Sequence, residues 1–583
     1  MRAPGLTAGP RRPPTTTKGT HIYSVIVCLA AGAPQKTSPP PPGIGAHAAR
    51  RLAGRVQQRP RPSPDLSSEL ACPHFGTCAG CTLQADLANP PARAAAAAWF
   101  AGQGFPLPPP GPATPSPHGW RTRARLAVRR PSSPWWDARP SIGLFAAGTH
   151  VVVDIVGAAG AAGQPASPSP PTPAATTPAN TPCPAHHPRL NAAAAAVAMA
   201  AASLSTAIFA DADNGRSLSA KDKKKKKKRD GRAAAAAAAA AAQGGGSAPP
   251  PPAAEGPPPF NPGLRYLQLT VVAPSAEAAL ARPPHADPEA AIQLVLVWGG
   301  AAGGDDGGQA GPRALAAALW ASHGPASSPT PLLHSIAINY QPDTGNAIMG
   351  AAWEAVAGDP AAAWQVAGGA AVSTPPAAFC QASPAAFGRL LGSAGELLDG
   401  ALGRHAAAGT PPAPITLADL FAGSGAVGLA LAARGLGAGT ARAHVAAVRA
   451  VDVNAAGGPA LAAGAAALAA RWAAEAPGTP PPSFQFVAAA AGEAPGDWLA
   501  GADAAVVDPP RKGLDPALLA ELVGDHPPPA LRALLYVACH FSSLKRDGDA
   551  LIASGKWRLG GGALEVLFWG ADAVEAVAVF ERV

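Results

Sequence analysis

Residues 415–435, ITLADLFAGSGAVGLALAARG, constrain the fold of this 583-residue chain more than any other stretch. An apolar run that contains Asp419 leads into a loop of small residues with Gly423 and Gly425, and an alanine- and leucine-rich run typical of a helix follows. Nucleotide-binding α/β units begin with this order of strand, glycine loop and helix. Glycines in the loop let the backbone approach a ligand that a side chain would exclude. The stretch therefore predicts an α/β domain with a ligand beside Gly423 and Gly425.

Apolar runs later in the chain carry polar residues at or near their ends. AVRAVDV contains Asp452, ADAAVVDPP contains Asp508, and ALLYVAC ends at Cys539. In a doubly wound sheet ligands bind at the carboxyl ends of the strands, where an acid after the second strand accepts ribose hydroxyls. The two prolines after Asp508 end that strand and hold the acid at the same edge. We therefore expect these three side chains at one edge, followed by a last pair of strands at 566–569 and 574–581.

Composition limits how much of the chain can pack. The sequence has 70 prolines and 65 glycines but only 5% aromatic residues. Segments this rich in alanine, proline and glycine bury too little surface to offset the entropy lost on ordering. We expect low-complexity inserts at about 157–182 and 205–262. A lysine run at 223–228 is interpreted as part of a solvated loop, with a nuclear address or an RNA-binding tail as alternatives.

The amino-terminal segment, residues 1–68, has the composition of an organelle transit peptide. It contains ten Lys and Arg residues and no acid before Asp65. A disordered tail is the alternative. We predict a chloroplast location, with the mitochondrion as the alternative and the nucleus less favoured. The net charge of +9 suits an anionic partner such as RNA, although this segment carries part of the excess. No apolar run reaches the length of a membrane span, so no membrane association is expected.

Three cysteines lie close together in CPHFGTCAGCTLQ. Seven cysteines in a chain this long are too few for a secreted disulfide framework, which leaves metal binding or catalysis. Clustered thiolates select zinc or an iron–sulfur cluster. A fourth ligand is needed, and Cys183 is preferred because it lies between the two inserts. The other candidates in this site are Cys72, Cys78 and Cys81, with His74 or His186 as further ligands if the metal is zinc.

A β-rich module is predicted between these cysteines and the α/β unit. Residues 141–155 (SIGLFAAGTHVVVDI) predict a hairpin, and a turn into another strand is expected at 346–350. The strand patterns between them lie at 264–272, 292–298 and 334–339.

Alternating arginines mark the start of this module. Arg121, Arg123 and Arg125 in GWRTRARLAVRR fall on one face of a strand, because side chains alternate across a strand. A basic strand face suits contact with phosphates. A solvated edge strand is an equally good interpretation of the same pattern.

Six motifs in order resemble the RNA uracil-C5 methyltransferase family. They are CPHFGTCAGC, FCQAS, DLFAGSG, VVDPPRKG, YVACHFSSLKRD and AVEAVAVFER, and the resemblance covers roughly residues 69–583 apart from the inserts. It implies a Rossmann-like methyltransferase domain at 376–583 that binds S-adenosylmethionine, preceded at 69–375 by a β-rich RNA-binding domain with a [4Fe–4S] cluster. The implied substrate is ribosomal or transfer RNA. We expect a monomer with no obligate protein partner.

The resemblance also assigns roles by motif position. Cys539 falls on the nucleophile and Glu575 on the base. The cluster ligands fall on Cys72, Cys78, Cys81 and Cys183. The cofactor site comprises Gln381, Phe421, Asp452 and Asp508, the loop residues Gly423 and Gly425, and Ala426, which stands where the family often has a polar contact.

The implied reaction explains why a cysteine and a carboxylate are needed. Uracil C5 is a poor nucleophile until a thiolate adds to C6 and places carbanion character at C5. C5 then takes the methyl group, a base removes the C5 proton, and the thiol is expelled, so that one hard step is divided into easier ones. The uridine must also leave its stack to be reached. His540, Lys545 and Arg546 are candidates for the positive charge that favours the thiolate.

Several positions depart from the family pattern. Cys539 is followed by His540 and Phe541 where the family usually has Asn-Pro, Ser383 replaces an Asn, and Ala422 replaces a Cys or a similar residue. These changes support one alternative, a catalytically decayed iron–sulfur protein that binds RNA. A second alternative is an iron–sulfur enzyme that cleaves S-adenosylmethionine by radical chemistry. The usual three-cysteine spacing of that class is absent.

Overall fold

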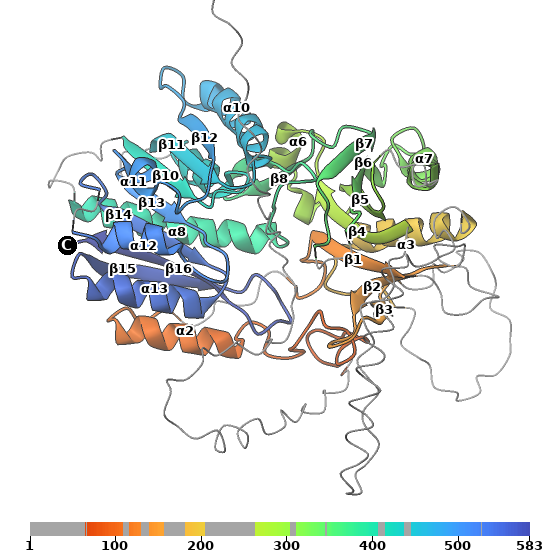
Figure 1. Ribbon diagram of the computed structural model, residues 1–583, viewed down its shortest axis with the longest axis horizontal. Helices are drawn as coiled ribbons and strands as arrows, with labels where there is room; N and C mark the ends of the chain where they lie inside the picture. Colours follow the sequence, from red (N-terminus) through yellow and green to blue (C-terminus); the bar gives the residue numbers. More distant parts are fainter. Residues whose placement is uncertain are drawn as a thin grey trace, which may run out of the picture.

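The structure, a computed structural model, describes residues 65, 67–108, 116–129, 139–156, 181–204, 263–302, 310–343, 347–405, 414–436, 445–525 and 528–583. The predicted transit peptide up to residue 64, the lysine run and nearly all of both predicted inserts lie outside this set. The described residues form two seven-stranded sheets and a two-stranded hairpin (Figure 1).

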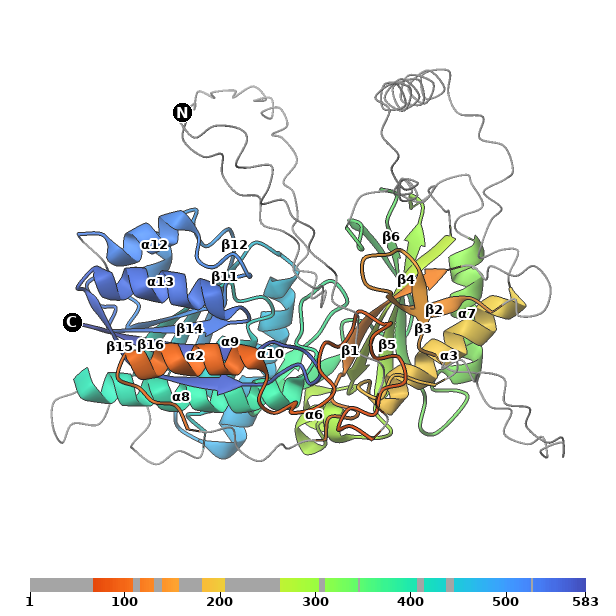
Figure 2. The same cartoon turned by 90° about the horizontal axis from the view of Figure 1, so that it is seen from below.

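The first sheet is built mainly from antiparallel strands in the order β3-β2-β1-β4-β5-β6-β7, with only β5 and β6 parallel. Helices α3 (Pro188–Ser203) and α7 (Ala310–His323) pack on the same side of it (Figure 2). The short helices α6 (Ala276–Ala281) and η1 (Pro284–Ala286) follow β4. The strands are β1 (Arg123–Arg129), β2 (Ser141–Phe145), β3 (Val152–Asp154), β4 (Gly263–Val272), β5 (Ala291–Gly299), β6 (Leu333–Tyr340) and β7 (Ala352–Ala357).

The sequence located these strands well. The predicted hairpin at 141–155 is β2 and β3, which pair antiparallel. The three strand patterns that follow correspond to β4, β5 and β6, and the turn expected at 346–350 leads into β7. Apolar β-branched and leucine side chains dominate these runs, and they bury the core between the sheet and α3 and α7.

The second sheet has the order β12-β11-β10-β13-β14-β16-β15. The first five strands are parallel, and β16 inserts antiparallel between β14 and β15. This mostly parallel sheet has the α/β architecture predicted from the sequence. The strands are β10 (Ile415–Leu420), β11 (Val445–Asp452), β12 (Ser483–Ala488), β13 (Ala504–Val507), β14 (Ala533–Ala538), β15 (Trp557–Glu565) and β16 (Glu575–Arg582).

Helices cover both faces of the second sheet. Helices α8 (Pro384–His405), α9 (Ala426–Ala433) and α10 (Gly457–Glu475) form one core with it. The opposite core contains α2 (Pro91–Gly102), α11 (Pro495–Leu499), α12 (Pro516–Val523) and α13 (Phe541–Ala553). Helix α2 comes from the segment assigned by sequence to the first domain, and it packs on β15 and α13 of the second (Figure 2).

Burial on both faces explains why the parallel strands appear in the sequence as unbroken apolar runs. Along β14, Leu534 and Tyr536 belong to the core beneath α12 and α13, whereas Leu535 and Val537 belong to the core beneath α8. Strands covered on both sides do not need a polar face.

The last pair of strands was only half correctly predicted. The strand at 574–581 is β16, but its partner is β15 and not residues 566–569, which are buried without being a strand. Strand β15 contains three consecutive glycines, Gly560 to Gly562. Because glycine has a low strand propensity, the sequence does not predict a strand there. A Cβ at Gly562 would meet Phe100 Cε1 at 2.1 Å, so packing against α2 requires the glycine.

Hairpin β8–β9 (Trp364–Ala367 and Ala370–Ser373) contacts α8, α9 and α10 of the second sheet and α6 of the first. The segment after it leads into α8. None of the helices in the described residues is both long and apolar enough to cross a membrane.

Candidate active site

A pocket of about 550 Å³, including its open mouth, lies at the carboxyl edge of the second sheet. The loop after β10, residues 379–381, hairpin β8–β9 and the start of α8 line it. Five of the seven side chains or glycines predicted to contact a cofactor line it: Gln381, Phe421, Gly423, Ala426 and Asp508.

The other two predicted residues, Asp452 and Gly425, do not line the pocket but determine the conformation of the loop. Asp452, at the end of β11, accepts the Gly423 N–H at 2.9 Å and the Asn454 N–H at 2.7 Å, one on each carboxylate oxygen. Each oxygen keeps acceptor capacity for a hydroxyl group. Gly425 has φ 77° and immediately precedes α9, where a Cβ would meet Leu461 Cδ1 at 2.4 Å. A glycine is therefore required there for both conformation and space.

The loop holds Phe421 in a strained conformation. Its φ of 65° is in the left-handed region, which a bulky side chain seldom occupies. Strain of this kind persists only where the surrounding structure enforces it, and it is concentrated at ligand sites. The half-buried ring lies in the pocket wall beside Gly423.

Three carboxylates from adjacent strands lie close together at the pocket, and Asp508 is the one that lines it. Asp419 in β10 is fully buried; one oxygen accepts the Gly428 N–H at 3.0 Å, and Oδ1 has no hydrogen-bond partner. Burial, with Asp452 nearby, raises the pKa of Asp419 to about 7. Burial and the charges of Asp419 and Asp452 also raise the pKa of Asp508 to about 7. The carboxyl edge of the second sheet therefore favours a cationic ligand, because a positive charge would stabilise the ionised forms of these carboxyl groups.

Strand pairing brings Cys539 and Glu575 together. In the antiparallel register of β14 and β16, Ala538 lies opposite Ala576, so the next positions are Cys539 and Glu575. Burial, followed by the charges of Glu575 and Asp508, raises the pKa of Cys539 to about 12. Burial and Asp508 raise the pKa of Glu575 to about 8. The predicted nucleophile and base therefore occupy one low-dielectric site beside the pocket residue Asp508.

The cation of this site is Arg511, which sequence reasoning missed. Its charge lowers the pKa values of both Cys539 and Glu575. The expectation that Lys545 or Arg546 would supply this charge is wrong, because each pairs with a carboxylate of its own helix. Their partners are Asp549 and Asp547. His540, the third candidate, is exposed.

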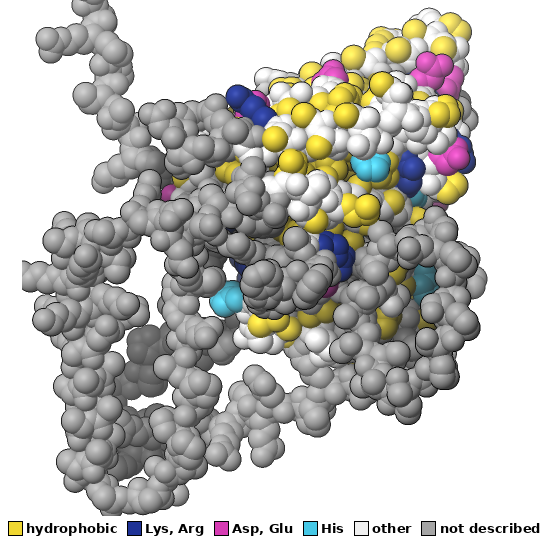
Figure 3. Space-filling model, turned by 90° about the vertical axis from the view of Figure 1, so that its right-hand side faces the viewer, with side chains coloured by type: hydrophobic (Ala, Val, Ile, Leu, Met, Phe, Trp, Pro, Cys, Tyr) yellow, Lys and Arg dark blue, Asp and Glu magenta, His cyan; other side chains and the backbone are white. Residues whose placement is uncertain are grey.

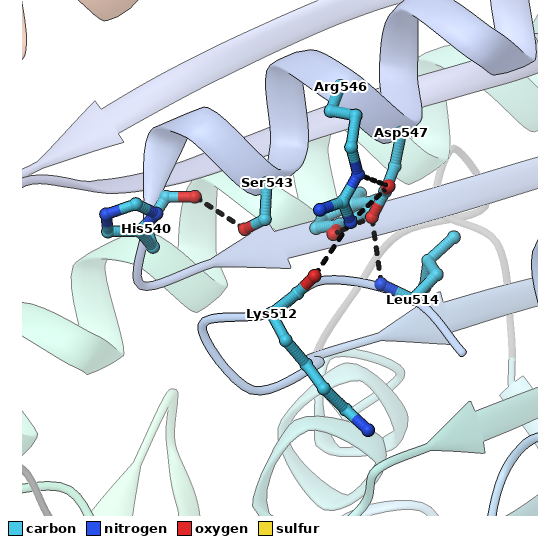
Figure 4. Close-up of polar contacts among 7 residues, drawn as sticks. Lys512, Leu514, His540, Ser543, Arg546 and Asp547 are labelled. Atoms are coloured by element: carbon cyan, nitrogen blue, oxygen red, sulfur yellow. Dashed lines mark hydrogen bonds and ion pairs between the residues drawn. The ribbon is translucent and has the colours of Figure 1, made fainter. Parts of the chain in front are cut away.

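A buried carboxylate fixes the loop that carries Arg511 (Figure 4). Asp547 in α13 is fully buried and accepts the Leu514 N–H at 2.8 Å and the Tyr536 hydroxyl at 2.7 Å. Arg546 binds its other oxygen and donates to the Lys512 carbonyl at 2.8 Å. The loop after Asp508 is thus tied to the helix that follows the nucleophile.

Gly513, at the centre of that loop, gives a direct test of the network. Its φ is +86°, and a Cβ there would meet Arg546 Nη2 at 2.1 Å and Asp547 Oδ2 at 2.4 Å. For Gly513→Ala we expect a loss of about 1–2 kcal/mol from the left-handed backbone and a further loss of about 1–3 kcal/mol from overpacking. Urea unfolding measures it. Gly555→Ala is the control, with φ +69° and open space around the Cβ; equal losses in the two variants would contradict this role.

The four cysteines assigned to a cluster lie near one another, and Cys78 pairs with Ala146 just after β2. Burial raises the pKa of Cys72 to about 11 and that of Cys78 to about 12, and Cys183 raises both further. Burial and the same neighbours also raise the pKa of Cys81. However, no three His, Cys, Asp or Glu side chains within the described residues are grouped closely enough to hold a metal ion. The four thiols are therefore close enough to affect one another's pKa values, but in this structure they are not arranged as the ligands of one metal ion.

The two histidines considered for zinc have other partners. His74 Nε2 lies 2.7 Å from the Thr181 carbonyl, and His186 Nδ1 lies 3.2 Å from Asn191 Oδ1. Arg121 lies beside the thiols, with its guanidinium 4.7 Å from the centre of the Trp120 ring, and its charge lowers the pKa values of Cys78, Cys81 and Cys183.

The alternating arginines do not form a phosphate-binding face. Strand β1 lies inside the sheet between β2 and β4, which excludes the edge-strand interpretation as well. Arg123 is only 8% exposed, and Arg125 Nε donates to Gln268 Oε1 at 2.8 Å. Figure 3 views the first-sheet end of the molecule, and on its described surface the Lys and Arg side chains lie apart from one another. The arginines of this motif instead make contacts within the protein.

Comparison with known proteins identifies relatives, although no established sequence-family profile matches the chain. The chain is 24% identical over 523 residues to an uncharacterized RNA methyltransferase of Protochlamydia amoebophila. This match covers 89% of this chain and 99% of that protein. It is 34% identical over 82 residues to the 23S rRNA (uracil(1939)-C(5))-methyltransferase RlmD of Burkholderia cenocepacia. That match covers 14% of this chain and only 18% of the relative.

A solved structure is similar over most of its length. It is the Pyrococcus abyssi tRNA (uracil-54, C5)-methyltransferase in complex with S-adenosyl-L-homocysteine, with 17% identity and a TM-score of 0.45. The similarity covers 86% of this chain and 85% of that one. Both sequence relatives are named as RNA methyltransferases, and the one from Burkholderia cenocepacia is named as a uracil-C5 enzyme, in agreement with the family that the six ordered motifs resemble.

Proposed function

We propose that this protein transfers a methyl group from S-adenosylmethionine to C5 of a uridine in ribosomal or transfer RNA. The opposition of Cys539 and Glu575 across β14 and β16 carries the proposal, because uracil-C5 methylation needs a thiolate and a base at one site. The names of the sequence relatives agree with this substrate class.

The pocket residues fit S-adenosylmethionine. Asp452 is placed for the ribose hydroxyls, and the buried carboxylates Asp419 and Asp508 favour a positively charged ligand. Bound there, S-adenosylmethionine supplies an electrophilic methyl group on a cationic sulfur.

The protein groups then act on the uracil ring. The Cys539 thiolate forms a bond to C6, and the electron pair of the C5–C6 double bond moves into the ring as an enolate. C5 bonds to the methyl group, and the electron pair of the broken S–CH₃ bond stays on the departing sulfur. Glu575 takes the C5 proton, the double bond re-forms, and the C6–S bond breaks to release the thiolate. Arg511 offsets the negative charge at this site during these steps.

The high pKa of Glu575 predicts a pH-dependent rate. A carboxyl group with a pKa of about 8 is mostly protonated at neutral pH and cannot accept a proton. We therefore expect the rate at which the methylated RNA is released from the covalent adduct to rise between about pH 6 and pH 9, because only the ionised carboxylate can take the C5 proton and the ideal base has a pKa near the working pH. Rapid quenching with labelled S-adenosylmethionine measures it. A rate that does not change over this range would contradict the role of Glu575.

We further propose that Cys72, Cys78, Cys81 and Cys183 hold a [4Fe–4S] cluster. Four thiolates are the usual ligand set, and the charge of Arg121 offsets an anionic cluster. Since methyl transfer moves no electron, the cluster is assigned a structural role in the β-rich domain.

Iron and sulfide analysis of anaerobically purified protein tests this site. We expect equal amounts of both, with visible absorption from thiolate-bound iron, and loss of both in Cys183→Ser. Cys380→Ser, a cysteine outside the group, is the control and keeps its iron. Bound zinc without sulfide, or iron that survives Cys183→Ser, would contradict the assignment.

Transfer of label from methyl-labelled S-adenosylmethionine to separate pools of unmodified ribosomal and transfer RNA tests the function. Label in one pool supports the proposal and selects the substrate. RNA binding without label in either pool would favour a decayed RNA-binding protein, an outcome for which His540 and Phe541 beside the nucleophile provide the reason. We also propose an organellar, preferably chloroplast, location, which import of the full chain into isolated organelles tests.

A further inference from the structure

One wall of the cofactor pocket is a segment without secondary structure of its own. Residues 376–382 connect hairpin β8–β9 to α8 and contain no helix or strand. Phe379, Cys380 and Gln381 from this segment line the pocket together with the glycine loop. Phe379 is 39% exposed, although it is a large apolar side chain. The position of this wall therefore depends on what holds the segment from outside.

A buried arginine of the first sheet holds the middle of the segment. Arg123, at the start of β1, donates from Nη2 to the Ala378 carbonyl at 3.1 Å and from Nη1 to Cys380 Sγ at 2.6 Å. The guanidinium thus donates hydrogen bonds to the residues on either side of Phe379. A planar guanidinium offers donors in a fixed fork, which an ammonium group cannot reproduce.

Neighbouring residues of the same sheet hold the two ends of the segment. Thr122 donates from its backbone N–H to the Ala382 carbonyl at 2.8 Å. Gln268 in β4 donates from Nε2 to the Pro376 carbonyl at 2.9 Å, and its own oxygen accepts from Arg125 Nε. The first sheet therefore holds a segment that lines the pocket, although the first sheet itself does not line it.

Burial makes the contribution of Arg123 specific. At 8% exposure its charge is largely removed from water, which is costly unless the group is well hydrogen-bonded. Its partners are a sulfur and a carbonyl of the pocket wall. An apolar side chain would fill the same space without this cost, so the arginine is best explained by the geometry that its fork imposes on residues 378–380.

We infer that Arg123 is a positioning residue for the cofactor pocket: through Ala378 and Cys380 it holds Phe379 and Gln381 in the conformation that binds S-adenosylmethionine. The inference rests on the proposed function for the identity of the ligand. It also makes the β-rich sheet part of the cofactor site. The apparent affinity for the cofactor then depends on the fraction of molecules in which residues 378–381 have the binding conformation. The apparent Kd equals the intrinsic Kd divided by that fraction.

Direct binding of S-adenosylhomocysteine, measured by calorimetry on the full-length protein, tests the inference without any RNA. For Arg123→Met we expect the Kd to rise about tenfold, as it does when the competent fraction falls to about one tenth. Arg123→Lys, which keeps the charge and loses the fork, and Cys380→Ala, which removes one acceptor, should show smaller rises. Arg129→Met is the matched control: it lies at the other end of β1, over the rings of Phe145 and Tyr266, and should bind normally.

Two further readouts separate positioning from general stability. Amide hydrogen exchange in 376–382 should accelerate in Arg123→Met, whereas exchange in the other strands stays unchanged. The KM for S-adenosylmethionine should rise while kcat at saturation is kept. Normal S-adenosylhomocysteine affinity in both Arg123→Met and Cys380→Ala overturns the inference, and if Arg123→Met does not fold, Cys380→Ala decides alone. A wild-type protein that binds no S-adenosylhomocysteine overturns the proposed function together with the inference.

Discussion

Cys539→Ala is expected to abolish methyl transfer and leave RNA binding nearly intact. The thiolate is the group that makes C5 reactive, so its removal should lower the single-turnover rate by at least about 10⁴-fold, as the loss of a covalent nucleophile does. RNA binding should change little, because one half-buried side chain contributes little to an RNA interface dominated by phosphate contacts. Labelled methyl transfer and filter binding on the same preparations measure the two quantities.

Two companion variants sharpen this test. Cys539→Ser keeps the size and polarity of the side chain but has a hydroxyl of much lower nucleophilicity, so its loss should be nearly as large. Ser542→Ala, at an exposed position three residues further on, should retain full activity. Methylation by Cys539→Ala at the wild-type rate would show that another residue is the nucleophile.

Glu575→Gln is expected to trap the reaction after methyl transfer. Without a base the C5 proton remains, so the C6–S bond cannot break and the protein stays covalently attached to the methylated RNA. Turnover should fall by about 10²–10⁴-fold, the usual contribution of a general base. A denaturing gel should show a slowly migrating RNA–protein band that carries the methyl label.

The neighbouring glutamate provides the matched control for this variant. Glu565 lies opposite Glu575 in the register of β15 and β16, but its carboxylate pairs with Arg389 at 2.7 Å. Glu565→Gln should turn over normally without a trapped band. If Glu575→Gln turns over normally too, the proton is taken by another base. If it forms no adduct and transfers no methyl group, Glu575 acts before methyl transfer.

Four parallel strands of the catalytic domain, β10, β11, β13 and β14, could be predicted because both of their faces are covered, whereas the edge strand β12, which has exposed side chains, was not predicted. The runs of the four strands are continuous and apolar, and each ends at a residue whose polarity marks the ligand edge, as Asp508 and Cys539 do. Strand β15 could not be predicted, because its glycines serve close packing against Phe100 and carry no strand propensity. Local pattern thus fails where a distant helix determines the residue.

The candidate site shows the same division. Motifs identified Cys539 and Glu575, but their opposition depends on the pairing of β14 with β16, which no local pattern gives. The role of Arg511 was missed because three other basic groups lie nearer to Cys539 in sequence. Two of those groups pair with acids of their own helix. Basic residues that are close to Cys539 in sequence were predicted to act on it, whereas the cation that acts on it in the folded chain is Arg511.

The arginines of β1 were misinterpreted for a related reason. Alternation correctly predicted a strand but not its surroundings, since a buried basic side chain and an exposed one give the same pattern. Only the fold shows that Arg123 reaches residues 378–380 and that Arg125 binds Gln268. Three cysteines were recognised by their density in the sequence, and Cys183, which was also chosen from the sequence, lies close enough to act electrostatically on Cys78.

Mass spectrometry of nucleosides tests the central claim most directly. Unmodified RNA would be incubated with anaerobically purified protein and S-adenosylmethionine that carries a heavy methyl group, then digested to nucleosides. The account predicts heavy 5-methyluridine with wild-type protein and none with Cys539→Ala. A heavy methyl group on any other nucleoside, or heavy 5-methyluridine formed equally by both proteins, would contradict it.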